Sequence, residues 1–107
     1  NGITGIICVN DLLAYGVMDS LVEKGYSIPK DFSIIGSDNL LYSSLCGVSL
    51  TTIEHHPQIV AESAYSVLLM RAKSVFLTYS AAPKLEVTCQ PTLIIRSSTG
   101  PISGSSE

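Results

Sequence analysis

The sequence predicts an α/β fold built on a parallel sheet, and three observations near its start support this. Residues 3–9 form a continuous apolar run rich in β-branched side chains, which is typical of a strand buried on both faces. Helix signals follow from residue 10, and a second short apolar run lies at residues 32–36. Strand, helix and strand in so short a stretch form a βαβ unit, whose strands are parallel by default.

The expected helix has signals at both ends. Asn10 is a good N-cap, and Asp11 places negative charge at the first turn, where the helix dipole favours it. Gly25 suits the position just past the helix, with Lys24 in the last turn and Pro29 beyond. We therefore expect the helix to begin at residue 11 and to stop near residue 25.

This helix is apolar over more of its surface than a sheet requires. Its apolar side chains sweep an arc of roughly 200°, whereas covering a sheet needs a stripe of about 100°. The face that we expect to cover the sheet consists of Leu13, Val17 and Leu21. The surplus face carries Tyr15, Met18 and Val22. We expect a second copy of the helix to cover it across a two-fold axis; missing parts of the same subunit are the alternative.

The rest of the chain is less regular. In order, we expect an irregular stretch (39–49), an extended segment (50–53), a long helix opened by Pro57 and reaching about residue 73 or beyond, two short strands (85–89 and 92–96) split by Pro91, and a loose Ser- and Gly-rich tail (98–107).

Composition limits the possible functions. Apolar residues make up 46% of the 107 residues and charged residues only 14%, below the ~25–35% charge of a typical solvated surface. The chain therefore buries surface against something else or belongs to a larger body. Its net charge is −3, and its six Lys and Arg residues are spread along the sequence, so another segment would have to bind any DNA. No apolar run is long enough to span a membrane.

The sequence contains no recognisable catalytic or metal-binding motif. Cys8, Cys46 and Cys89 are odd in number and widely spaced, which predicts free thiols in a reducing cytoplasm and no metal site. Phosphate-binding glycine loops and hydrolase or metalloprotease signatures are absent. His55 and His56 are adjacent and would point to opposite sides of an extended chain. We expect no enzyme activity, no cofactor and no metal.

Polar residues follow both strands of the βαβ unit. Asn10 and Asp11 follow the first strand, and Asp38 and Asn39 follow the second. Ligands of parallel sheets bind beyond the carboxyl ends of the strands, and these groups suit a ligand with several hydroxyls. Asn10 also has a capping role, whereas Asp38 has none that we can name. We expect Asp38 and Asn10 to contact a ligand, and Asp11 and Asn39 to be mainly structural.

Four segments of the chain resemble the lactose/galactose repressor (LacI/GalR) family. Residues 8–16 (CVNDLLAYG) resemble the family's A-N-D-x-x-A-x-G pattern, and residues 28–39 (IPKDFSIIGSDN) resemble its v-P-x-D-(V/I)-S-(V/I)-(V/I)-G-(F/Y)-D-(D/N) pattern. Residues 50–53 (LTTI) match its L-T-T-(V/I), and residues 55–61 resemble an altered form of its next helix start. The segments occur in the family's order and spacing.

The resemblance implies a three-layer, periplasmic-binding-protein-like fold whose two α/β lobes close on a small molecule, with only part of this domain present. Residues 1–97 would form its C-terminal portion, with a helix at 57–75 belonging to the other lobe. Asn10 and Asp38 match the family's effector-contacting residues, and Pro57 and Val60 fall where the other lobe lines the pocket. Ser37 replaces an aromatic residue at the pocket edge, which implies a larger or more polar edge.

The resemblance also implies how subunits pair. Seven residues fall where C-terminal lobes meet or on the surplus helix face: Tyr15, Met18, Asp19, Val22, Tyr42, Ser43 and Cys46.

The implied function is effector sensing in a cytoplasmic, homodimeric transcriptional repressor. The effector would be a sugar, a sugar phosphate or a nucleobase, and DNA would be bound by a helix-turn-helix outside this chain. A sugar-type solute-binding protein of an ABC transporter is the alternative, and a small hydrolase on an α/β sheet is a second rival.

Overall fold

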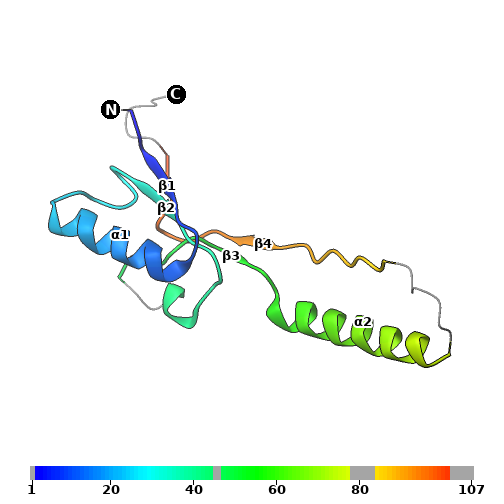
Figure 1. Cartoon of the computed structure of the whole chain (residues 1–107). Coiled ribbons are helices and arrows are strands. Elements are labelled where there is room, and N and C mark those ends of the chain that lie inside the picture. The colour runs from blue at the N-terminus through cyan, green and yellow to red at the C-terminus, as the bar shows by residue number, and fades with distance from the viewer. Residues whose placement is uncertain (1, 45–46, 78–83, 102–107) are drawn as a thin grey trace. The chain divides into compact units, whose positions relative to one another are not determined.

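The computed structural model describes residues 2–44, 47–77 and 84–101 (Figure 1). Its elements are β1 (Gly5–Ile7), α1 (Asp11–Glu23), β2 (Ser33–Ile35), a 3-10 helix η1 (Leu41–Ser44), β3 (Thr52–Glu54), α2 (Pro57–Leu77) and β4 (Thr92–Ile94). The chain divides into two compact units. The first unit contains Asn1–Glu54 and Thr92–Glu107, and the second contains His55–Pro91.

The first unit contains the expected βαβ arrangement. β1 pairs with β2 in parallel, with Gly5 opposite Ser33 and Ile7 opposite Ile35. α1 connects the two strands and packs on β2. Gly25 has a φ of 85°, the left-handed conformation that ends helices at a glycine. The predicted helix boundaries are therefore confirmed.

Two different segments lie beside the other edge of β2. Residues 51–53 lie along its C-terminal end, where the amide of Gly36 donates to the Thr51 carbonyl (2.9 Å) and that of Asp38 to the Ile53 carbonyl (2.9 Å). The C-terminal segment lies along its beginning, where the amide of Ile34 donates to the Ser98 carbonyl (2.8 Å).

Ser98 bridges these two segments. Its hydroxyl donates to the Ile34 carbonyl (2.6 Å) and accepts from the Thr51 amide (2.8 Å), and the residue is fully buried. The hydroxyl of Ser33 also donates to the Gly100 carbonyl (3.2 Å). The prediction of a loose tail from residue 98 is thus wrong at its start, because this serine-rich segment forms hydrogen bonds with the edge of the sheet. The rest of the predicted tail, residues 102–107, lies outside the described residues.

The core of the first unit is small and shows how α1 is rotated. It consists of Ala14, Met18, Ile34 and Leu50. Leu13, expected to face the sheet, is 55% exposed, whereas Met18, expected to face outward, is only 7% exposed. The buried Asp11 carboxylate fixes the rotation of the helix, so the positions three and seven residues later face inward.

β1 is far more exposed than the sequence predicts. Ile3, Ile7 and Val9 are 67%, 76% and 76% exposed. Among the described residues only β2 pairs with β1. Ile6 and Cys8, which alternate with these residues, pack against the core, so the exposed residues lie on the other face of β1. The expectation of burial on both faces is therefore wrong for this chain, because none of the described residues covers that face.

β3 and β4 form an antiparallel pair, with Thr52 opposite Ile94 and Glu54 opposite Thr92. β4 agrees with the strand expected from residue 92 on, directly after Pro91. The strand expected at residues 85–89 is absent from the described structure. A strand needs a hydrogen-bonding partner, and no described segment pairs with these residues.

The described part of the second unit contains α2 and residues 84–91, which form neither a helix nor a strand. Pro57 opens α2, as predicted. Tyr65, Leu68 and Met70 are 62%, 64% and 53% exposed, so α2 presents apolar side chains that this unit does not cover. Of the helices in the described parts of the chain, none is both long enough and apolar enough to cross a membrane.

Candidate functional site

The candidate site lies at the carboxyl ends of β1 and β2, which the backbone holds side by side. The amide of Cys8 donates to the Ile35 carbonyl and that of Asp11 to the Ser37 carbonyl, both at 2.8 Å. Asn10 therefore lies at the same edge as residues 37–39. We call Asn10 and residues 37–39 the ligand edge.

Asn10 has two separable groups. Its backbone is extended (φ −153°, ψ 170°), and its side-chain oxygen accepts from the Leu13 amide at 2.9 Å, so Asn10 caps α1 as the sequence predicts. The NH2 group of the same side chain takes no part in this cap. A half-buried amide donor is thus held at the ligand edge by a helix cap.

Asp38 stands in a strained conformation at this edge. Its φ is 109°, and the next residue, Asn39, has a φ of 50°. A non-glycine residue in a sparsely populated region costs about 1–3 kcal/mol, and such residues cluster at functional sites. The Asp38 side chain is exposed, and within the described residues no group bonds to its carboxylate. That carboxylate is available as an acceptor for a ligand.

Asp11 sits behind the edge and is fully buried. Its carboxylate accepts from the Leu40 amide (2.9 Å) and from the hydroxyls of Ser43 (2.6 Å) and Thr52 (2.6 Å). These bonds join the first turn of α1 to the segment after β2 and to β3. Asp11 is structural, as expected. Ser43 is fully buried within the first unit, and its contact with a second subunit stays a prediction.

Asn39 is also structural, and it uses both ends of its side-chain amide. The NH2 group donates to Glu54 Oε2 (2.7 Å), and the oxygen accepts from Arg96 Nη2 (2.7 Å). The second guanidinium nitrogen, Nη1, donates to the Leu50 carbonyl (2.9 Å). The sequence analysis did not predict that Glu54 and Arg96 hold Asn39. The only signal for this role was that each is a charged residue at the end of a segment otherwise rich in apolar residues and threonine.

The remaining expected ligand contacts differ in position. Ser37 lies at the ligand edge, where its carbonyl accepts from Asp11. Pro57 and Val60 lie on the first turns of α2, in the second unit, and both are exposed. Their place in a pocket stays a prediction.

The surface expected to pair subunits is partly exposed. Val22 is 59% and Tyr42 64% exposed, and Asp19 is exposed as well. Tyr15 is half-buried, and Met18 packs in the core while also lining the groove on this face. Their role in pairing subunits stays a prediction. Cys46 lies outside the described residues. A shallow groove of about 320 Å³ runs along this face, lined by Tyr15, Met18, Asp19, Val22, Glu23, Ile28, Gly47 and Val48.

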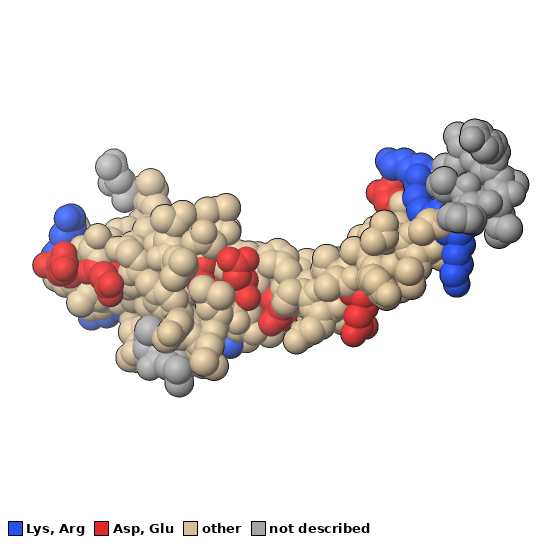
Figure 2. Space-filling model, turned by 60° about the horizontal axis from the view of Figure 1, so that its bottom comes forward, with Lys and Arg blue, Asp and Glu red and all other residues tan. Residues whose placement is uncertain are grey.

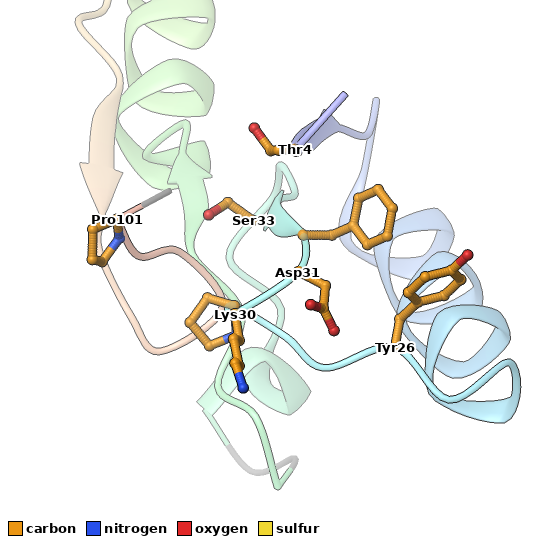
Figure 3. A pocket seen from close by; sticks show the side chains of 8 residues that line it. Thr4, Tyr26, Lys30, Asp31, Ser33 and Pro101 are labelled. Carbon is orange, nitrogen blue, oxygen red and sulfur yellow. The ribbon is translucent and has the colours of Figure 1, made fainter. Parts of the chain in front are cut away.

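A second cavity, of about 230 Å³, lies at the opposite edge of the sheet (Figure 3). It is lined by Thr4, Tyr26, Pro29, Lys30, Asp31, Phe32, Ser33 and Pro101. The rings of Tyr26 and Phe32 meet edge to face with centroids 5.2 Å apart. Asp31 accepts from the Ser27 amide, and the Ser33 hydroxyl bonds both the amide and the carbonyl of Gly100. Since these polar groups are already used, the cavity is a poor candidate for a polar ligand.

Metal and thiol chemistry find little support in the described residues. Within them no cluster of three metal-ligating side chains occurs. Cys8 and Cys89 are free thiols. Burial raises the pKa of the Cys8 thiol, which makes it a weaker nucleophile at neutral pH. On the face drawn in Figure 2, uncharged residues form most of the surface.

Residues 3–99 match the family model described as "Periplasmic binding protein-like domain". The chain is 35% identical over 95 residues to the HTH-type transcriptional repressor PurR of Mannheimia succiniciproducens, and 40% identical over 70 residues to that of Vibrio atlanticus. These alignments cover 89% and 65% of this chain but only 27% and 21% of the relatives. The chain thus spans about a quarter of the length of these relatives.

Solved structures of LacI family transcriptional regulators are similar in fold. The regulator of Enterococcus faecalis with bound ribose has a TM-score of 0.80 at 33% identity, covering 96% of this chain and 37% of that one. The regulator of Arthrobacter sp. in complex with lactose has a TM-score of 0.76 at 27% identity, covering 92% and 36%.

Proposed function

The chain belongs to the periplasmic binding protein-like domain family, in the branch of the LacI/GalR transcriptional regulators, and from this premise we propose that it senses a small polyhydroxylated ligand for a transcriptional repressor. The observation that carries this proposal is the ligand edge. There the amide of Asn10, which caps α1, and the exposed carboxylate of Asp38, whose backbone is strained, lie at the ends of two adjacent parallel strands.

A sugar fits this edge because its hydroxyls both donate and accept hydrogen bonds. The Asp38 carboxylate accepts from two neighbouring hydroxyls, and the Asn10 NH2 group donates to a third oxygen. Similar regulators hold ribose or lactose. Sugar phosphates and nucleobases are the other candidates, the latter because of the likeness to PurR repressors.

In the intact protein, the second unit would contribute Pro57 and Val60 to the other side of the pocket. Ligand bound between two lobes would favour one lobe arrangement and change operator affinity through a DNA-binding segment outside this chain. Coupling of this kind is worth about 1–3 kcal/mol. The similar PurR proteins are transcriptional repressors, so we favour a cytoplasmic, non-enzymatic regulator over a transporter's binding protein.

Homodimerisation is part of the same proposal. Three of the expected interface residues are exposed, Asp19 and Val22 on α1 and Tyr42 on η1, and they offer a mixed apolar and polar patch. A two-fold axis would place the patch against itself.

The test is ligand-induced stabilisation of the full-length protein by D-ribose, D-glucose, lactose, ribose 5-phosphate and hypoxanthine. A ligand at 100 times its Kd raises the unfolding free energy by about 2.7 kcal/mol. Asp38→Asn keeps the shape of the side chain but replaces an acceptor oxygen by a donor, so we expect affinity to fall roughly 10–100-fold. Glu86→Gln, which changes an exposed carboxylate outside the ligand edge and outside the proposed interface, is the matched control. A panel without any thermal shift, or an Asp38→Asn variant with unchanged affinity, contradicts the proposal.

A further inference from the structure

Two consecutive residues with positive φ at the ligand edge need support from their surroundings. Asp38 (φ 109°) and Asn39 (φ 50°) are not glycines, so each would relax toward negative φ unless neighbouring groups held it. The hydrogen bonds around them identify those groups.

The first set of bonds leads to β3. The Asp38 amide donates to the Ile53 carbonyl (2.9 Å), and the Asn39 amide donates to Thr52 Oγ1 (3.2 Å). The Asn39 side chain adds its bond to Glu54 Oε2 (2.7 Å). All three residues of β3 therefore bond to the ligand edge.

The second set leads to the end of β4. Arg96 lies two residues after β4 and donates through Nη2 to Asn39 Oδ1 (2.7 Å). Its own amide donates to Thr51 Oγ1 (2.9 Å). Asn39 is thus bonded at one end of its amide to β3 and at the other end to the segment after β4.

These two segments border the second unit. β3 ends at Glu54, directly before that unit, and β4 begins at Thr92, directly after it. We infer that Asn39 is a positioning residue. When a ligand displaces Asp38, Asn39 transmits the movement to the segment that enters residues 55–91 and to the segment that leaves them. The inference rests on the proposed function, because it assigns to Asp38 the contact with ligand.

The role requires an asparagine for two reasons. Asparagine tolerates a φ near 50° better than most residues. Its amide also donates to a carboxylate and accepts from a guanidinium at the same time. Aspartate would place a second carboxylate against Glu54, and glycine would keep the backbone conformation but remove both side-chain bonds.

The experiment compares Asn39→Gly, Arg96→Lys and Ser97→Ala in the full-length protein by amide hydrogen exchange. We expect Asn39→Gly to raise exchange about tenfold or more at residues 38–40 and also at Arg96, whose amide bonds on the other side of the network. Arg96→Lys should reproduce this pattern. Ser97→Ala removes two bonds to Ser49 from the next residue of the same segment, and its effect should stay at residues 49 and 97.

The binding arm uses D-ribose, or whichever compound of the panel stabilises the wild type. Asn39→Gly should weaken binding about tenfold, and in an Asp38→Asn background it should weaken binding no further, because Asn39 acts through Asp38. Additive losses would overturn the inference, as would faster exchange confined to residues 38–40. If no compound binds the wild type, the proposed function fails, and the exchange pattern alone decides whether Asn39 links the two segments.

Discussion

Asp11 carries a carboxylate into the interior of the first unit, where three donors surround it, two from the segment after β2 and one from β3. Hydrogen bonds to a charged group contribute about 1.5–3 kcal/mol each, and a buried donor left without a partner costs a similar amount. Asp11 therefore holds α1, the segment after β2 and β3 together more than any apolar contact of this small core.

Replacing this carboxylate by an amide tests its contribution. Asp11→Asn directs an NH2 group at one of the donors, so we expect the unfolding free energy of the intact protein to fall by about 2–4 kcal/mol in urea denaturation. Glu62→Gln makes the same change from carboxylate to amide at an exposed position of α2 and should shift it by less than about 0.5 kcal/mol. An equal fall in the unfolding free energy of both variants would show that the hydrogen bonds of the buried carboxylate contribute no extra stability.

At the residue scale, the sequence predicted roles that depend on local geometry. The cap by Asn10 and the common edge for Asn10 and Asp38 followed from the order of strand, cap and helix. The partners of Asp11 and Asn39 could not be predicted, because Thr52, Glu54 and Arg96 are brought to them by pairing between segments distant in sequence.

At the element scale, α1 and β2 approach each other closely at Gly36. A Cβ added there would overlap with Asp11 Oδ1 and lie 2.9 Å from Leu50 Cδ2. Asp11 and Leu50 are both fully buried, so neither side chain can move away freely. The glycine before the ligand edge is thus required by packing between the start of α1 and the end of β2.

Two glycine-to-alanine substitutions separate packing from backbone preference. Gly36→Ala should lower the unfolding free energy by about 1–3 kcal/mol or more, because the site is already filled. Gly16→Ala, in the middle of α1 with no atom within 4 Å of its added Cβ, should raise it by about 0.5–1 kcal/mol through helix propensity. Thermal or urea unfolding of the intact protein measures both. A neutral Gly36→Ala would contradict the close packing.

The helices, the βαβ unit and the strand after Pro91 were predictable from periodicity, caps and turn residues, whereas the absence of the strand expected at residues 85–89 and the rotation of α1 were not. Residues 85–89 have a strand-like composition but no described partner. Serine is typical of loops, yet the Ser98 hydroxyl donates to the Ile34 carbonyl of β2 and accepts from the Thr51 amide. In both cases the outcome depends on the neighbouring segment and not on local propensity.

At the scale of the whole molecule, much apolar surface remains exposed in each unit. Ile7 and Val9 at β1 and Tyr65 and Leu68 on α2 are all more than half exposed. The low charge of the sequence predicted such surface, and the match to about a quarter of the length of the relatives is consistent with it. Composition could not tell which surface a second subunit would cover and which the rest of the same subunit would cover.

Val22 is the residue that best distinguishes these two possibilities. It is 59% exposed and lies on the groove along α1. If this face pairs with its copy across a two-fold axis, Val22→Arg places two unpaired charges in the interface. We expect the dimer to weaken by about 3 kcal/mol, or roughly a hundredfold in Kd, and sedimentation of the full-length protein to shift from dimer to monomer.

The matched control is Ser20→Arg, which introduces the same side chain on the same helix at an exposed position turned about 160° away from Val22. It should leave the dimer intact. A Val22→Arg protein that stays folded and dimeric would show that another surface pairs the subunits, and the surplus apolar face of α1 would then have to be covered within one subunit. Loss of folding in Val22→Arg alone would point to the same conclusion, because an interface residue should tolerate arginine in the monomer.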